Sequence, residues 1–365
     1  MILAAALVSV NACAPAYRAA PPSQERRWTA YLGSSRRANA AADTLAADPA
    51  PVWRTDVGRG VVGAPALTEG LVLLSQVDRH LAVLDRRTGA VVWRHGFGEN
   101  IGSGPLVDYD RVYVATETEE GRVAALDLAT GNRQWSTRVG DVAAPIAMRD
   151  ARIYAGTTDG LLVALSADGG SVLWRARLPG GVRAAPVAVA EGVIVATASD
   201  SLFLVNGTTG EIRARRGTSG AVLAAPALAD SLLVVGTTSG RLEGCDAATL
   251  RTLWSRDLGS GVVGAVAVQR DTAFVLTHDG DLWRVPLRLP EGATKLALGV
   301  VARAAPVPVA GGVLVADVTG QLSLVGAGGA RLWTAKLHPP LSEPAVVDGR
   351  FFVAASERGE VVAYQ

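Results

Sequence analysis

Side chains capable of acid–base, nucleophilic or metal chemistry are scattered along this chain of 365 residues. The histidines have no neighbour at the spacing of metal ligands; they are His80, His95, His278 and His338. Acidic residues lie at or near the predicted second-to-third-strand turns of different units, at Asp78, Glu117, Glu119, Glu120, Asp159, Asp200, Asp279 and Glu357. The glycines lie between predicted strands and open no helix, so they form no phosphate-binding loop. Local spacing therefore predicts no catalytic residue and no metal site, although a Ser-His-Asp arrangement could still assemble across the fold.

Cys13 is the residue whose surroundings indicate a covalent modification. It follows an apolar run from Ile2 to Val10 and stands directly after the small residue Ala12. This arrangement resembles the end of a bacterial lipoprotein signal, which makes Cys13 the predicted lipidation site. The run is too short to span a bilayer. An ordinary cleaved signal with an incidental cysteine is the alternative.

The second cysteine, Cys245, lies in an apolar run that reads as a strand. No histidine stands beside it, so the simplest interpretation is a small buried residue. Two cysteines so far apart in sequence predict neither a disulfide nor a zinc site.

A repeated unit must position all of these residues. Tryptophan or its replacement recurs at Trp53, Trp93, Trp135, Trp174, Ala214, Trp254, Thr294 and Trp333. A small residue followed by proline keeps the same period, as in Ala64-Pro65, Ala144-Pro145 and Ala185-Pro186. A fixed period of about forty residues indicates a repeat architecture.

Each unit reads as four short strands. Apolar, β-branched runs alternate with Gly, Asp, Asn and Thr, and no helical spacing is sustained after residue 50. Four strands at this period are one blade of a propeller, so we expect an all-β, eight-bladed β-propeller of antiparallel sheets. The last unit lacks its fourth strand, while residues 51–54 form a strand without three predecessors. We therefore expect the N-terminal strand to complete the last blade and remove two exposed edges.

The turn Asp-x-x-Thr-Gly-x-x-x-Trp joins the third and fourth strands of a unit. Asp and Thr side chains can bond nearby backbone, and Gly supplies a positive φ. The indole can then bury its ring against the next blade while its N–H keeps one partner. The predicted repeat-docking residues are Trp53, Trp93, Trp135, Trp174, Trp254, Trp333, Asp85, Gly89, Asp127, Gly131 and Asp246. This signature resembles the tryptophan-docking repeat of the pyrroloquinoline-quinone (PQQ)-like propellers, over residues 50–365.

Composition and charge divide the chain into three parts. We expect a signal-like segment at 1–13, a flexible Ala/Pro/Arg-rich linker at 14–50 and the propeller at 51–365. The formal net charge is +1, and the arginines stand singly. Neither feature suits a nucleic-acid-binding surface, and we predict no nucleic-acid partner. The expected state is a monomer that meets the membrane only through its lipid.

An exported, lipid-anchored propeller without catalytic residues resembles the BamB-type outer-membrane assembly lipoproteins. That resemblance implies a scaffold on the periplasmic face of the outer membrane that binds protein partners, including the β-barrel insertase, through loops between the Trp strand and the following proline. The matching loops here are 178–183 and 219–223, with Val182, Arg183 and Leu223 as predicted partner-binding residues. The second loop lacks the acids that the family carries there.

Two other functions are compatible with the same repeat. One is an exported ligand-binding or sensory propeller, in which Arg183 and Arg303 would form an anion-binding rim at one mouth of the axis. The other is a quinoprotein dehydrogenase, which would need PQQ, a calcium ion and a catalytic base. Because the acids do not gather in one region, we predict a non-enzyme without a cofactor, with PQQ as the alternative.

Overall fold

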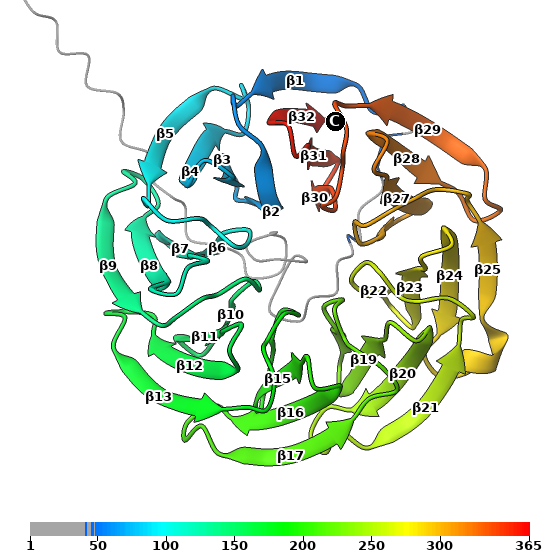
Figure 1. Ribbon diagram of the computed structural model, residues 1–365. Coiled ribbons are helices and arrows are strands. Elements are labelled where there is room, and N and C mark those ends of the chain that lie inside the picture. The colour runs from blue at the N-terminus through cyan, green and yellow to red at the C-terminus, as the bar shows by residue number, and fades with distance from the viewer. Residues whose placement is uncertain (1–40, 42–44, 47) are drawn as a thin grey trace, which may run out of the picture.

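The computed structural model describes residues 41, 45–46 and 48–365, and it contains eight four-stranded antiparallel sheets arranged as blades around one axis (Figure 1). The predicted all-β propeller with eight blades is confirmed. The predictions for Cys13, for the signal-like segment and for most of the linker lie outside the described residues.

The strand bounds follow the repeat. Blades 1 to 3 comprise β2 (Val61–Leu67), β3 (Leu71–Gln76), β4 (His80–Asp85) and β5 (Val91–Gly96); β6 (Leu106–Asp108), β7 (Arg111–Ala115), β8 (Arg122–Asp127) and β9 (Arg133–Arg138); and β10 (Ala147–Arg149), β11 (Arg152–Gly156), β12 (Leu161–Ser166) and β13 (Val172–Arg177). Blades 4 to 6 comprise β14 (Val187–Val189), β15 (Gly192–Thr197), β16 (Ser201–Asn206) and β17 (Ile212–Gly217); β18 (Ala227–Ala229), β19 (Leu232–Gly236), β20 (Arg241–Asp246) and β21 (Thr252–Asp257); and β22 (Ala267–Gln269), β23 (Thr272–Leu276), β24 (Asp281–Pro286) and β25 (Thr294–Ala297). Blade 7 comprises β26 (Val307–Val309), β27 (Gly312–Ala316), β28 (Gln321–Val325) and β29 (Arg331–Lys336), and blade 8 comprises β30 (Val346–Asp348), β31 (Phe351–Ala355), β32 (Glu360–Tyr364) and β1 (Pro51–Asp56). The one helical turn among them, η1 (Pro290–Gly292), lies between β24 and β25.

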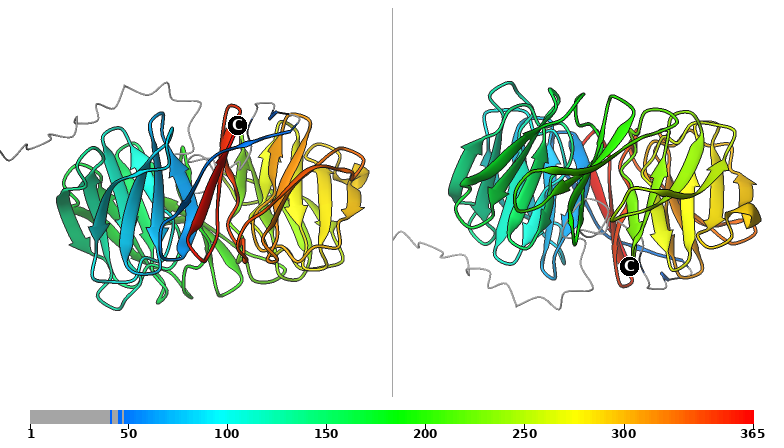
Figure 2. Two further views of the ribbon diagram at one scale, coloured as in Figure 1. Left: turned by 90° about the horizontal axis from the view of Figure 1, so that it is seen from above. Right: turned by 90° about the horizontal axis from the view of Figure 1, so that it is seen from below.

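The disc has two faces with different connections. Because the strands of a blade alternate in direction, the links from one blade to the next share a face with the second-to-third-strand turns; we call this the loop face. The Asp-x-x-Thr-Gly turns lie on the opposite, hairpin face. The chain ends at Gln365 on the hairpin face, as the edge-on views show (Figure 2).

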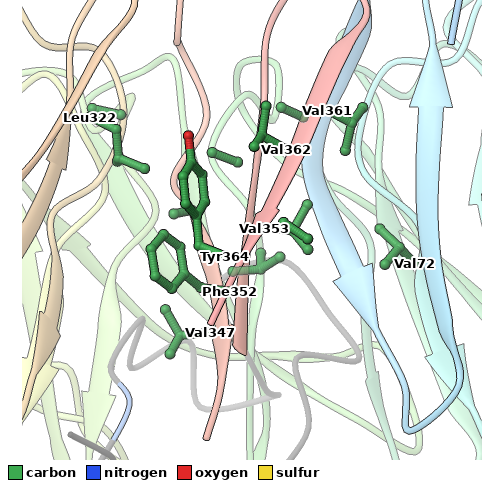
Figure 3. Packing of buried hydrophobic residues seen from close by; sticks show 14 of the residues in the cluster. Val72, Leu322, Val347, Phe352, Val353, Val361, Val362 and Tyr364 are labelled. Atoms are coloured by element: carbon green, nitrogen blue, oxygen red, sulfur yellow. The ribbon is translucent and has the colours of Figure 1, made fainter. Parts of the chain in front are cut away.

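The N-terminal strand closes the ring as predicted. β1 pairs with β32 in antiparallel register, from Pro51 opposite Tyr364 to Asp56 opposite Glu360. Ala50 extends this pairing, since its backbone exchanges hydrogen bonds of 3.1 and 3.0 Å with that of Gln365. Val361 and Val362 of β32 are fully buried in the blade 8 core, where the rings of Phe352 and Tyr364 are stacked (Figure 3). The closure therefore joins the two ends of the chain in one apolar sheet.

Residues before Pro51 also contact the propeller. Ala41 and Leu45 are each 6% exposed and belong to the core cluster of blades 7, 8 and 1. The Ala41 backbone N–H donates to the carbonyl of Pro308 at 3.0 Å. At these points the segment expected to be linker packs on the disc.

The repeated tryptophans join neighbouring blades. The Trp53 indole N–H donates to the carbonyl of Arg86 in the turn of the next blade, at 2.7 Å. A Cβ added to Gly89 of that turn would stand 2.6 Å from the Trp53 ring. Gly89 has φ of 71°, so this position needs glycine both for its backbone and for the indole above it. Trp93, Trp135 and Trp174 make the same bond to Leu128, Ala167 and Gly207.

The aspartate of the turn stabilises the backbone conformation that the indole contacts. Asp85 accepts hydrogen bonds from the Thr88 backbone and hydroxyl, both at 2.8 Å. Partial burial disfavours its charge, but the bonds from Thr88 outweigh it and lower the pKa of Asp85. Asp127 makes the same pair of bonds to Thr130, and Asp246 to Thr249. The predicted chemistry of the turn is confirmed.

Two tryptophans depart from the predicted docking. The Trp254 indole nitrogen is buried without a hydrogen-bond partner in the described chain, because η1 replaces the hairpin turn of the next blade. Trp333 faces blade 8, whose third and fourth strands are not joined by a turn, and it packs edge-on against Phe352 and Tyr364, with ring centroids 5.8 and 5.1 Å away. One partner for every indole N–H was therefore a wrong expectation.

Blade 4 carries Ala214 in place of the indole, and the next blade compensates. The glycine position of its turn is Leu250, which has φ of 59° and is 1% exposed. Leu250 lies in the same apolar cluster as Ala214. The leucine side chain thus fills the volume that a tryptophan occupies elsewhere, at the cost of about 1 kcal/mol of backbone strain.

We predict that Ala214 and Leu250 are energetically coupled. Ala214→Trp alone places an indole on the Leu250 side chain, and Leu250→Gly alone opens a cavity, so each lowers the free energy of unfolding by about 2–3 kcal/mol. The double variant rebuilds the Trp–Gly dock and recovers most of the loss. Urea denaturation of the four proteins measures the coupling. Additive losses would show that these residues do not share one site.

Candidate functional site

The candidate site lies on the loop face, where the links between blades approach the axis. Arg183 lies in the link between β13 and β14, and Leu223 holds the same position before the proline of the next blade. Arg183 is exposed, and Leu223 is 54% exposed. The two predicted residues therefore present one cation and one apolar side chain on consecutive blades.

Val182 differs from this expectation because it is fully buried. Its N–H donates to the carbonyl of Thr157 at 2.9 Å, and it bridges to Thr197 of the neighbouring strand. Gly156 leaves room for it, since a Cβ there would stand 2.5 Å from a Val182 methyl group. The burial contradicts a direct contact of Val182 with a partner. Its packing instead fixes the backbone from which Arg183 projects.

Acidic groups near Arg183 shape the charge of this face. Burial raises the pKa of Glu117, and the neighbouring charge of Asp141 adds to the effect, whereas Arg183 opposes it. Asp141 itself accepts a hydrogen bond from Thr158 at 2.6 Å. Arg183 makes no hydrogen bond or ion pair with any residue that the structure describes. The described part of the protein therefore leaves the donors of this guanidinium group unused.

Small residues of the links between blades pack against one another. Ala185, Ala225, Ala265 and Ala305 come from four consecutive blades and pack into one buried cluster. Arg303 is exposed on the link before blade 7, and Arg183 stands before blade 4. The two arginines are separated by blades whose matching positions are apolar, so they do not form a local pair.

Blade 8 places a carboxyl group where the other blades have a small residue. Glu343 accepts a hydrogen bond from the Gly63 backbone, and burial raises its pKa to about 8, with the charge of Glu357 adding to the rise. The sequence marks this position, because Glu343-Pro344 is the one member of the small-residue–proline series that is charged. Periodicity did not reveal that Glu343 is only partly exposed.

The described residues do not fit a quinone–metal centre. Within residues 48–365, no three His, Cys, Asp or Glu side chains come close enough to hold a metal ion. Cys245 is fully buried, as predicted, and burial raises the pKa of its thiol to about 11. That shift leaves the thiol protonated and unreactive.

These features identify the class of propeller. A ring of eight blades joined by indole docks, with exposed residues on the links between blades, is a PQQ-like propeller. The family described as outer membrane protein assembly factor BamB matches residues 42–147, 119–215 and 205–288, which together span more than half of the chain. The chain belongs to this family.

Individual relatives and structures agree with that assignment. The chain is 24% identical to the outer membrane protein assembly factor BamB of Yersinia pestis over 309 residues, which covers 73% of this chain and 76% of the relative. It is 26% identical to that of Legionella pneumophila (strain Paris) over 192 residues, a match that spans 49% of each protein, about half the length of this relative.

Solved structures share the fold. BamB from Moraxella catarrhalis superposes with a TM-score of 0.75 at 19% identity, covering 87% of this chain and 99% of that one. A europium-containing methanol dehydrogenase superposes with a TM-score of 0.79 at 11% identity, covering 93% and 98%. At such identities, these superpositions show the propeller alone.

We predict that Glu343 makes stability fall as pH rises. In the unfolded chain its carboxyl group loses a proton near the ordinary value of 4.5, and in the folded protein near pH 8. Between these values only the folded state keeps the proton, so its contribution is complete below pH 4.5 and is lost up to pH 8. Glu343→Gln should stabilise the protein at pH 8 and flatten the profile between pH 5 and 8, measured by urea denaturation. Glu357→Gln is the control, and an unchanged profile for Glu343→Gln would contradict the prediction.

Proposed function

We propose that this protein is a non-catalytic scaffold of the cell envelope that is anchored by lipid and binds protein partners in outer-membrane β-barrel assembly. The observation that carries the proposal is membership of the family described as outer membrane protein assembly factor BamB, combined with the unpaired Arg183 and the exposed Leu223 on the loop face. The partner that we expect at this face is the β-barrel insertase.

The two faces of the disc allow the lipid anchor and the protein partner to lie on opposite sides. Gln269 ends the innermost strand of blade 6 on the hairpin face, and its Nε2 donates to the carbonyl of Ala41 at 2.8 Å. The segment that leads back toward Cys13 therefore joins the propeller on the face opposite Arg183. An anchor attached there leaves the loop face free for a partner.

The non-enzymatic part of the proposal rests on the residues at the axis. A dehydrogenase would need a metal–quinone pair and a base, and the described side chains near the axis are alanines and isolated acids. The superposition on methanol dehydrogenase concerns the blades rather than these residues. A scaffold needs only a rigid surface with a few exposed anchors, which the loop face supplies.

The proposed anchor is the lipid on Cys13 alone. Among the residues that the structure describes, no helix has the length and apolar character needed to cross a membrane. A lipidated cysteine at the start of a long tether would hold the disc at the periplasmic face of the outer membrane.

Reversing the charge of Arg183 should remove the insertase from the complex. In a pull-down from crosslinked envelopes, we expect Arg183→Glu to recover roughly tenfold less insertase than wild type, because the partner would meet a like charge or lose its hydrogen bonds. Arg350→Glu is the matched control, an equally exposed arginine on the hairpin face that should leave recovery unchanged. Equal recovery with both variants would place the interface elsewhere. Absence of the insertase from the wild-type sample would favour a ligand-binding propeller.

Cys13→Ser should release the protein from the membrane. We expect the variant to appear in the periplasmic fraction and to incorporate no labelled fatty acid, because the acyl acceptor is gone. Cys245→Ala removes the other, buried cysteine and should leave labelling and fractionation unchanged. Continued membrane association of Cys13→Ser would show that another feature anchors the chain.

A further inference from the structure

A cleft between blades 6 and 7 lies at one of the two docks that have no indole. It has a volume of about 470 Å³. Thr294, which stands at the tryptophan position of blade 6, lines it, as do Phe274, Arg284 and Ala327. Thr294 is exposed and too small to reach the turn of blade 7. The cleft is therefore not a surface irregularity but the place at which the repeat elsewhere buries an aromatic ring.

One wall of the cleft is an aromatic ring without its usual partner. In blades 2 and 3, an aromatic residue of the second strand packs on the tryptophan of the same blade, with centroids 5.9 Å apart for Tyr113 and Trp135 and 6.0 Å for Tyr154 and Trp174. Phe274 is the matching residue of blade 6. Without a tryptophan at position 294, one side of Phe274 borders the cleft.

The same blade supplies the polar contact. Arg284 lies directly across the sheet from both Phe274 and Thr294. Its guanidinium group donates to the carbonyls of Ala327 at 2.8 Å and Gly326 at 3.1 Å, the turn that an indole N–H would otherwise reach. Its Nε is buried and has no hydrogen-bond partner among the described residues. A fixed guanidinium plane beside a phenyl ring is a site for an aromatic group, through stacking and cation–π attraction.

The inner end of the cleft is where the described chain begins. Gln269 lines the cleft, and its Nε2 donates to the carbonyl of Ala41 at 2.8 Å and to that of Pro308 at 3.3 Å. Val309, the next residue after Pro308, lines the cleft as well. Ala41 thus attaches to the disc beside this site.

We propose that the cleft binds the indole of Trp28 from this chain's own N-terminal segment. Residues 1–40 lie outside the described residues, and their sequence places Trp28 thirteen residues before Ala41. An extended segment of that length spans roughly 45 Å, more than enough to reach any part of the cleft. The covalent connection gives the ring a millimolar effective concentration, which favours it over an aromatic group in free solution. The missing repeat tryptophan is then supplied from outside the repeat.

Photo-crosslinking of the full-length protein tests this assignment directly. With p-benzoyl-phenylalanine at position 28, we expect crosslinks to peptides that contain Phe274, Arg284 or residues 309–313. Position 31, an aromatic residue of the same segment, is the matched control and should not crosslink there. Crosslinks from position 28 to other blades would overturn the proposal.

A substitution cycle tests whether the indole fills the missing dock. Trp28→Ala should lower Tm by about 2 °C, because a ligand of the folded state is lost, whereas Tyr31→Ala should not. In a Thr294→Trp background the cleft holds the repeat's own indole, and Trp28→Ala should have no effect on Tm. Equal shifts for Trp28→Ala in both backgrounds, or for Trp28→Ala and Tyr31→Ala, would contradict the assignment.

Binding of a free indole compound distinguishes occupation of the cleft by Trp28 from occupation by a side chain of another protein. N-acetyl-tryptophanamide should bind the Trp28→Ala protein at least ten times more tightly than wild type, because wild type already holds an indole in the cleft. Equal binding to both would show that the cleft is open to an aromatic side chain of another protein and that Trp28 does not occupy it. No binding to Trp28→Ala would show that the cleft does not recognise an indole.

Discussion

The contact between an indole and a glycine in the next blade is the interaction on which this propeller depends. Each blade is a separate sheet, and only its neighbours keep it in the ring. The Trp53 ring lies against Gly89, where a side chain would collide with it, and the indole N–H bonds the same turn. Apolar burial and one directed hydrogen bond therefore act at a single point. The turn geometry held by Asp85 presents both partners.

Several blades depart from this contact. In two of them, other side chains fill the space between neighbouring blades. Leu250 projects into the space that Ala214 leaves open, so the bulk comes from the opposite partner. Trp333 meets two aromatic rings at the blade where the chain ends join. At Thr294 the bulk is not replaced, and Arg284 covers only the carbonyls. The cleft between blades 6 and 7 exists because no side chain replaces the missing indole there.

A closed ring also separates the functions of its faces. The strand directions send the blade-to-blade links to one side, where Arg183 and Leu223 are exposed, and the described start of the chain to the other side. A partner at the loop face and an attachment at the hairpin face can therefore act without competing for surface.

The sequence by itself determined the eight blades, the closure by residues 51–56 and the chemistry of the Asp85 turn. These features depend on period, turn residues and strand count, which are local properties of the chain. It also placed Arg183 on a link, but it could not show that Val182 beside it is buried, because adjacent residues of an extended segment face opposite ways and only the neighbouring blade decides which side is inside. The buried carboxyl of Glu343, the exchange of bulk between Ala214 and Leu250, and the cleft beside Thr294 were likewise decided by tertiary structure alone. Each of these features depends on contacts between residues of different blades. A repeat pattern predicts the strands and turns of one blade but not its side-chain contacts with the next blade.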